Sequence, residues 1–193
     1  MNYLAHALLS PDDPQIMMGN LWGDILKPRD YPLLSPGVNT GIQRHRMIDA
    51  FTDQHRDVDE INRLIRPFQG KYTPVVADVL MDFILSKYWH LFHPKPLEKF
   101  CNNKYQLVTK HIRLIPERLH PRIQRMISHR WLESCKDRNR MEQTFLMLSK
   151  RASFENKIPD AMKPYNIYEK EMDSLFLRFF EELRSYINLQ NAR

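Results

Sequence analysis

The chain has 193 residues, of which 42% are hydrophobic and 27% charged, and its formal net charge is +6. This length allows one domain with a substantial core, and the composition excludes a disordered chain. No apolar run approaches the roughly 18 residues that a membrane span needs. Because the first residues show no basic leader and the two cysteines, Cys101 and Cys135, fit free thiols, we expect a cytoplasmic protein with no membrane partner.

The predicted elements are helices throughout. Asp13 followed by Pro14 predicts an N-cap and a proline in the first turn of a helix with the sequence QIMMGNLWGDIL. A loop broken by prolines is expected over residues 27–37. The next helix should begin near 38–41 and break or kink near 52–55. The glycines of this region indicate tight turns or a close approach of two backbones.

Thr73 and Pro74 repeat the cap-plus-proline start, and the apolar segment that follows them predicts a central, buried helix. Further helices are predicted near 97–115, 122–135, 138–151 and 167–188. No segment alternates as a strand does. The sequence therefore predicts an all-α, single-domain bundle of about seven helices spanning residues 1–193.

Positive charge is concentrated in the second half of the chain. Between Lys104 and Arg151 there are twelve Lys or Arg against four Asp or Glu, which leaves a net charge of −2 for the remainder. Such a segment attracts anionic partners, whether nucleic acid, membrane or an acidic protein. The alternative is a well-solvated helical surface.

The stretch HRMIDAFTDQH places two imidazoles and two carboxylates within eleven residues. On a helix, His45, Asp49 and Asp53 form one row, and His55 lies just beyond it. Because Asp and His are poor helix formers, this choice of residues indicates ligands rather than a solvated face.

Two further carboxylates, Asp78 and Asp82, stand one turn apart in the apolar segment VVADVLMDFIL. Buried carboxylates must pair with a base, accept hydrogen bonds or bind a metal. A structural ion pair with Arg44 or Arg46 is therefore the alternative to a metal site.

Taken together, the acidic and imidazole side chains of the first half predict a catalytic site for a divalent cation. Oxygen-rich ligation with some nitrogen favours Mn²⁺, Mg²⁺ or Fe²⁺ over a structural zinc. The expected ligands are Asp24, His45, Asp49, Asp78 and Asp82, with His6, Asp53 and His55 in reserve.

The segments MNYLAH, GNLWGD, HRMIDAFTDQH and DVLMDFILSKYW, in this order, resemble the acyl carrier protein phosphodiesterase family of bacteria. The later segments RMISHRWLESC and LSKRASFENKIPDA are also similar to that family. The resemblance implies a helical fold related to the HD phosphohydrolases, which are named for an adjacent His-Asp pair. This chain has no such pair, and its nearest equivalents are His45 with Asp49, and Asp53 with His55.

The resemblance implies hydrolysis of the phosphodiester that joins 4′-phosphopantetheine to a serine of holo acyl carrier protein, with Mn²⁺ as the expected cofactor. The metal would lower the pKa of a bound water, and the resulting hydroxide would attack phosphorus. His6, Asp53 or His55 would orient this water or protonate the leaving serine. Arg44 and Arg46 would neutralise phosphate charge.

Acyl carrier proteins are small and acidic, so the basic half would steer this partner by electrostatics. Two alternatives stay open. One is a related metal phosphohydrolase that acts on a nucleotide or another phosphodiester. The other is a basic helical adaptor that binds nucleic acid without catalysis, a partner that we do not expect. The sequence does not indicate an oligomeric state.

Overall fold

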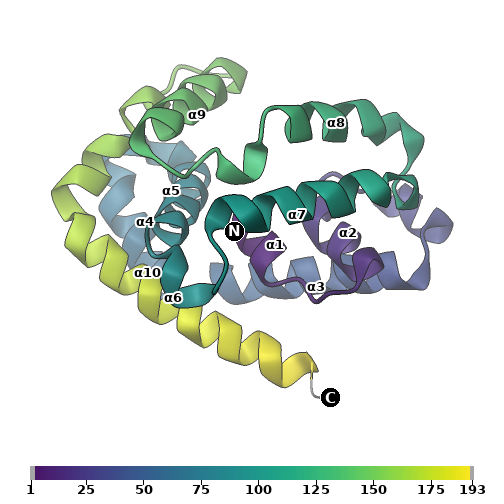
Figure 1. Ribbon diagram of the computed structural model, residues 1–193. Helices are drawn as coiled ribbons and strands as arrows, with labels where there is room; N and C mark the ends of the chain where they lie inside the picture. Colours follow the sequence, from purple (N-terminus) through teal and green to yellow (C-terminus); the bar gives the residue numbers. More distant parts are fainter. Residues whose placement is uncertain (1–2, 192–193) are drawn as a thin grey trace. The chain divides into compact units, whose positions relative to one another are not determined.

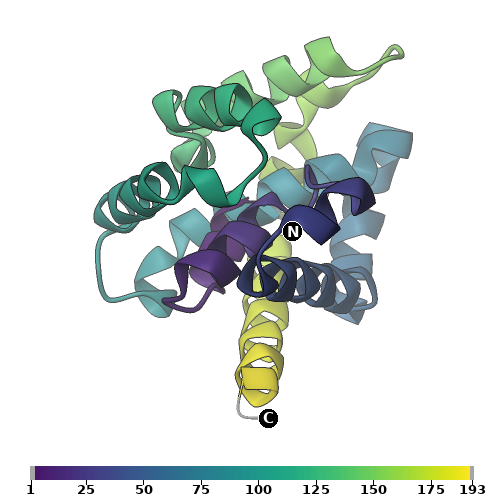
Figure 2. The same cartoon turned by 90° about the vertical axis from the view of Figure 1, so that its right-hand side faces the viewer.

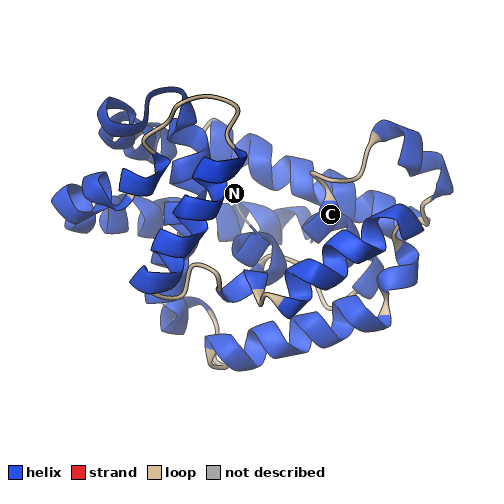
Figure 3. Cartoon of the chain, turned by 90° about the horizontal axis from the view of Figure 1, so that it is seen from above, coloured by secondary structure: helices blue, strands red, loops and turns tan. Residues whose placement is uncertain are grey.

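A computed structural model describes residues 3–191 of the chain. Within these residues the protein consists of ten α-helices and six short 3-10 helices, and it contains no strand (Figure 3). The helices are α1 (Tyr3–Leu8), α2 (Pro14–Trp22), α3 (Pro36–Asp53), α4 (Arg56–Gln69), α5 (Thr73–Lys87), α6 (Trp89–Phe92), α7 (Leu97–Lys110), α8 (His120–Ser128), α9 (Arg138–Arg151) and α10 (Met162–Asn191) (Figure 1).

The all-α fold class is confirmed, but the expected number of about seven helices is too low for the described part of the chain. The short helices α1 and α6 account for part of the difference, because each is a separate element rather than the edge of a longer one. The helix predicted over 122–135 ends at Ser128, since Arg130 adopts a positive φ of 51° that no helix continues through. The loop predicted over 27–37 contains a 3-10 helix, η1 (Pro28–Leu33).

Several predicted boundaries are confirmed. The side chain of Asp13 accepts hydrogen bonds from the backbone N–H groups of Gln15 and Ile16 and so caps α2. α9 covers the predicted range 138–151. The start predicted near residue 167 is wrong, because α10 begins at Met162; its backbone angles are non-helical at Tyr168, and the apolar pattern that led to the prediction lies beyond that kink.

The chain is divided into two compact units, each assembled from separate segments. The first, here called the α2 unit, contains residues 3–50 and 89–133. The second, called the α10 unit, contains residues 51–88 and 134–191. The single domain predicted over 1–193 stays a prediction, and its limits, like the start of the segment MNYLAH, lie outside the described residues.

In the α2 unit, helices α2 and α3 approach each other closely. A Cβ atom added to Gly19 would collide with the carbonyl oxygen of Val38, and one added to Gly41 would collide with that of Ile16. The glycines therefore permit the backbones to touch, as the sequence indicated. The core beside this contact is formed by fully buried side chains from α1 to α3: Leu4, Met17, Met18, Leu21, Trp22, Val38, Ile42 and Ile48.

In the α10 unit, the long helix α10 packs along α4, and α5 packs against both. The aromatic and aliphatic stripe of α10 is buried as the sequence predicted, and so is the apolar body of α5. The buried stripe consists of Leu175, Phe176, Phe179, Phe180, Leu183 and Ile187.

Both cysteines are buried free thiols, and burial raises the pKa of Cys135 well above its usual range. In the described part of the chain, no helix has the length and apolar character needed to cross a bilayer.

Candidate metal centre

Three segments of the α2 unit bring the candidate ligands together. His6 lies on α1, and His45 and Asp49 lie one turn apart on α3, so that their side chains project from the same face. Asp24 follows the end of α2. The turn-to-turn spacing in HRMIDAFTDQH therefore orients His45 and Asp49 as the sequence predicted, whereas the packing of α1 supplies His6.

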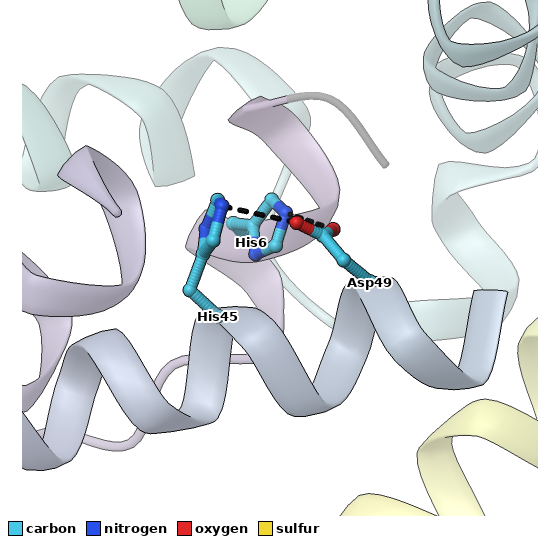
Figure 4. A group of neighbouring side chains, drawn as sticks. All are labelled: His6, His45 and Asp49. Atoms are coloured by element: carbon cyan, nitrogen blue, oxygen red, sulfur yellow. Dashed lines mark ion pairs between the residues drawn. The ribbon is translucent and has the colours of Figure 1, made fainter. Parts of the chain in front are cut away.

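His6, His45 and Asp49 form a compact cluster (Figure 4). The Nε2 atom of His6 lies 3.2 Å from Oδ1 of Asp49, and the Nε2 atom of His45 lies 3.0 Å from Oδ2 of the same carboxylate. Within residues 3–191, these are the one group of three His, Cys, Asp or Glu side chains whose ligand atoms all lie within 4.8 Å of one another. Both imidazoles are almost fully buried, and Asp49 is partly exposed.

Asn20, a fully buried residue of α2, fixes the orientation of both imidazoles. The Nδ2 group of Asn20 donates to the carbonyl oxygen of His6 and to Oγ of Ser10, each at 2.9 Å. Its Oδ1 atom must therefore accept the third bond, a 2.9 Å contact with Nδ1 of His6. The backbone oxygen of Asn20 accepts in the same way from Nδ1 of His45, at 2.8 Å. Both Nδ1 atoms consequently carry hydrogen, and both Nε2 atoms point at Asp49.

This arrangement leaves a polar atom without a hydrogen bond. Nε2 of His6 is buried and has no hydrogen-bond partner in the described structure, although it lies near the Asp49 carboxylate. A neutral imidazole with hydrogen on Nδ1 presents a lone pair at Nε2, and a lone pair that faces a carboxylate is repelled by it. A cation between these atoms would remove the repulsion.

In the metal-free protein, a protonated His45 compensates part of the negative charge of Asp24 and Asp49. Burial lowers the pKa of His45, but hydrogen bonds to Asp24 and Asp49 outweigh burial and raise the pKa to about 9. Burial lowers the pKa of His6 more strongly than Asp49 raises it. Burial raises the pKa of Asp49, yet the hydrogen bond from His45 and the nearby imidazole of His6 hold that pKa far below the usual range. The cluster therefore holds one cationic and one neutral imidazole at neutral pH.

Asp24 lies at the solvent side of the cluster. Its Oδ1 atom is 3.1 Å from Nε2 of His45, and 69% of its side chain is exposed. The hydrogen bond from His45 lowers the pKa of Asp24, so this carboxylate is ionised and available as a further ligand. Gly23 precedes it, and a Cβ atom at that position would collide with the ring of His45.

These donors fit a divalent cation. Two imidazole nitrogens and one or two carboxylates suit Mn²⁺ or Fe²⁺, and each imidazole is oriented by a partner at Nδ1, as metal-binding histidines usually are. Mg²⁺ prefers oxygen ligands, so the two nitrogens make it a poorer match. The nitrogen content is higher than the sequence indicated, because His6, expected to act on the proton or the water, lies among the ligand candidates.

The two arginines that flank His45 have different surroundings. Nε of Arg44 donates to the carbonyl oxygen of Leu9 at 2.8 Å, and Arg44 is only partly exposed. Arg46 is exposed, and its guanidinium donates to the hydroxyl of Tyr31 at 2.7 Å.

Four of the predicted site residues belong to the α10 unit. Asp78 and Asp82 lie on α5, where Asp82 is buried and Asp78 is half-buried. Asp53 is exposed at the end of α3. His55 caps α4: its Nδ1 atom accepts from the backbone N–H of Asp57, and its Nε2 atom donates to Glu182 at 3.1 Å. The predicted roles of these four residues in the metal site or in catalysis stay predictions.

The sequence does not identify Asn20 as part of the site, and it indicates Gly23 only as a place where another backbone approaches closely, not as the contact of the His45 ring. Both stand in the segment GNLWGD, between the residues that were singled out. An amide residue in an apolar helix is a signal for a buried hydrogen-bond network, but it does not identify the two imidazoles that the network holds.

Over the described residues, the fold and the site define an all-helical protein with a buried cluster of two His and one Asp whose ligand atoms lie close enough together to hold a metal ion. Residues 1–183 match the family model for acyl carrier protein phosphodiesterase. The chain belongs to this family.

Proteins called acyl carrier protein phosphodiesterase are similar to the chain over nearly their whole length. The protein of that name from Klebsiella pneumoniae (strain 342) is 27% identical over 187 residues, and that from Enterobacter sp. (strain 638) is 26% identical over 184 residues. The protein from Escherichia coli O6:K15:H31 is 26% identical over 189 residues. Each alignment covers 95% of this chain and 95% of the relative. No solved structure matches the chain.

Proposed function

We propose that the protein hydrolyses the phosphodiester between 4′-phosphopantetheine and the serine of holo acyl carrier protein, and that the cluster of His6, His45 and Asp49 is its metal centre. The supporting observation is the convergence of two imidazole Nε2 atoms and one carboxylate, 3.0 to 3.2 Å apart, in a chain of this family. The phosphodiester is the bond that the family name designates.

The side chains of the cluster would hold the cation, with Asp24 as a further ligand at the solvent side. A divalent cation at this place would lower the pKa of a water molecule and polarise the phosphoryl oxygens. Asn20 would keep both imidazoles in the tautomer that presents a lone pair at Nε2. Mn²⁺ is the cation that we expect, with Fe²⁺ as the alternative that fits the same donors.

The phosphate would lie near Arg46, because this guanidinium is exposed and follows His45 on α3. Arg44 donates to the backbone oxygen of Leu9, so its positive charge would attract the phosphate from a distance rather than by direct contact. Protonation of the leaving serine by Asp53 or His55, and ligation by Asp78 or Asp82, belong to the proposal as assignments that variants must test. The reducing cytoplasm is the compartment that we propose, in keeping with the two buried thiols.

The proposal is tested by incubating the protein with Mn²⁺ and holo acyl carrier protein and weighing the carrier by mass spectrometry. We expect loss of the phosphopantetheine mass and no loss when a chelator is present. Asp49→Asn should abolish turnover and weaken Mn²⁺ binding, because it removes the carboxylate that both imidazoles face. Asp59→Asn is the matched control, since Asp59 is exposed on α4. An active Asp49→Asn variant would exclude this metal centre.

A further inference from the structure

The 3-10 helix η1 carries an exposed apolar side chain, and four cations lie on η1, at its N-cap or on side chains that bond residues of η1. Leu33, at the end of η1, is 83% exposed, the highest value among the exposed large hydrophobic residues described. The cations come from η1 and from segments that contact it, and all four are exposed: Lys27, Arg29, Arg46 and Arg118. We call these five residues the η1 platform. The dark blue-purple stretch between α2 and α3, which contains η1, faces the viewer in Figure 2.

The platform is held together by specific bonds within the α2 unit. Asp30, a buried residue of η1, accepts from the backbone N–H of Lys27 at 2.8 Å and from the guanidinium of Arg118 at 2.5 Å. Arg46 donates to the hydroxyl of Tyr31 and lies 5.3 Å from the centre of its ring. Lys27, Arg46 and Arg118 are thus fixed relative to η1, and Arg29 lies on η1 itself.

The platform adjoins the candidate metal centre in the same unit. Nζ of Lys27 donates to the backbone oxygen of Asp24 at 3.2 Å, and the Asp24 side chain bonds His45. Arg46 follows His45 directly on α3. A partner seated on the platform would therefore lie next to the cluster.

The basic segment between Lys104 and Arg151 is divided between the two units. Seven of its twelve cations belong to the α2 unit and five to the α10 unit. Of the seven, Lys104 is buried and Arg130 pairs with the buried carboxylate of Glu133 at 2.7 Å. The η1 platform takes one cation, Arg118, from this segment, and that guanidinium also pairs with a buried carboxylate, that of Asp30, while 40% of the Arg118 side chain stays exposed. The other three cations of the platform come from outside the segment.

We propose that the η1 platform is the docking surface for the carrier protein, an inference that rests on the proposed function. Cations around an exposed leucine complement an acidic surface that also presents apolar side chains. An acidic carrier protein has the required sign of charge. A nucleic-acid duplex would use the cations but would gain little from an isolated leucine.

The experiment measures binding and turnover separately. Binding of fluorescently labelled apo carrier protein to the metal-free enzyme is compared for wild type, Arg29→Glu and Leu33→Ser. Arg29 and Leu33 are exposed, and in the described structure the side-chain bonds that hold η1 come from Asp30, Arg118 and Arg46, so both variants should fold. Arg125→Glu makes the same charge change at an exposed position on α8 of the same unit. Turnover is measured with holo carrier protein and with a small aryl phosphodiester.

We expect Arg29→Glu to weaken carrier binding by about tenfold and Leu33→Ser by about fivefold, with less than about twofold for Arg125→Glu. KM for the carrier should rise accordingly, while kcat and hydrolysis of the small diester stay unchanged. Equal binding by wild type and Arg29→Glu would overturn the platform. So would Arg29→Glu weakening the binding of a DNA duplex but not of the carrier. A wild type that binds the carrier but does not cleave it would overturn the proposed function and leave the platform supported.

Discussion

The imidazole rings of His6 and His45 stack with their centroids 4.1 Å apart and their planes inclined by 20°. Two cationic rings at this distance would repel each other. Burial is the main cause of the lowered pKa of His6, and the positive charge of His45 lowers it further. The stack is held from one side by Asn20 and faces one carboxylate on the other. It therefore concentrates two nitrogen ligands in a small volume with fixed lone-pair directions.

Removal of the Asn20 side chain should weaken metal binding without removing any ligand. Asn20→Ala deletes the acceptor for Nδ1 of His6 but leaves the backbone acceptor of His45. We expect Mn²⁺ affinity to fall by about tenfold to a hundredfold, as for other residues that orient metal ligands. Titration calorimetry measures the affinity, and the ¹⁵N shifts of the His6 ring in the metal-free protein report the tautomer.

Asn39→Ala provides the control for this substitution. Asn39 is another amide of the α2 unit, and its side chain donates to the backbone oxygen of Tyr31 rather than to a ligand candidate. Asn39→Ala should bind Mn²⁺ with the affinity of the wild type. If Asn20→Ala bound Mn²⁺ as tightly as Asn39→Ala does, Asn20 would have only a structural role.

The helical ligand pair was predictable because it depends on local spacing. His45 and Asp49 are four residues apart, and any helix brings such residues to one face. Capping chemistry was equally local, so Asp13 and the break before α4 could be located from the sequence. The glycines also predicted that another backbone lies close to α2, although the sequence could not identify Val38 of α3 as the contact of Gly19.

The remainder of the site depends on contacts between segments distant in sequence. From the sequence, His6 is predicted to act on water or a proton and is only a reserve ligand, because nothing local connects α1 to α3. The hydrogen bonds of Asn20 create that connection across 14 and 25 residues. Likewise, Arg118 reaches Asp30 across 88 residues, so the η1 platform is absent from any linear charge profile.

A methyl group at Gly23 should disturb the metal centre through His45. The added Cβ would overlap the ring of His45, which is held on its other side by the Asn20 carbonyl. The ring must move, and we expect Gly23→Ala to lower Mn²⁺ affinity by about tenfold or more while the helical circular dichroism is retained.

Gly70→Ala is the matched substitution in the α10 unit. Gly70 has a φ of 53°, and no atom lies within 4 Å of an added Cβ. This variant should lose about 1 kcal/mol of unfolding free energy through backbone strain, yet bind Mn²⁺ normally. Equal metal affinities for the two alanine variants would contradict the steric argument.

Two substitutions of His55 separate its effect on stability from its predicted role in catalysis. Its Nδ1 atom caps α4, so His55→Ala should cost about 1 kcal/mol of unfolding free energy. Asparagine is a good N-cap residue, and His55→Asn should recover most of that loss in a urea denaturation experiment. Turnover of the stable His55→Asn variant then tests the predicted proton transfer: strongly reduced turnover would support it, and unchanged turnover would exclude it.

Metal binding should release one proton near pH 7.5. In the metal-free protein His45 has a pKa of about 9 and is therefore protonated at this pH, but a metal requires its Nε2 lone pair. His6 has a lowered pKa, and Asp24 and Asp49 are already ionised, so none of them contributes a proton. The apparent Mn²⁺ affinity should rise by about tenfold per pH unit between pH 7 and 9, and then level off. Calorimetry in buffers of different ionisation enthalpy counts the released protons.

Asp24→Asn removes one of the hydrogen bonds that raise the pKa of His45, so metal binding to this variant should release less than one proton at pH 8. Binding without proton release in the wild type would show that His45 is not a ligand.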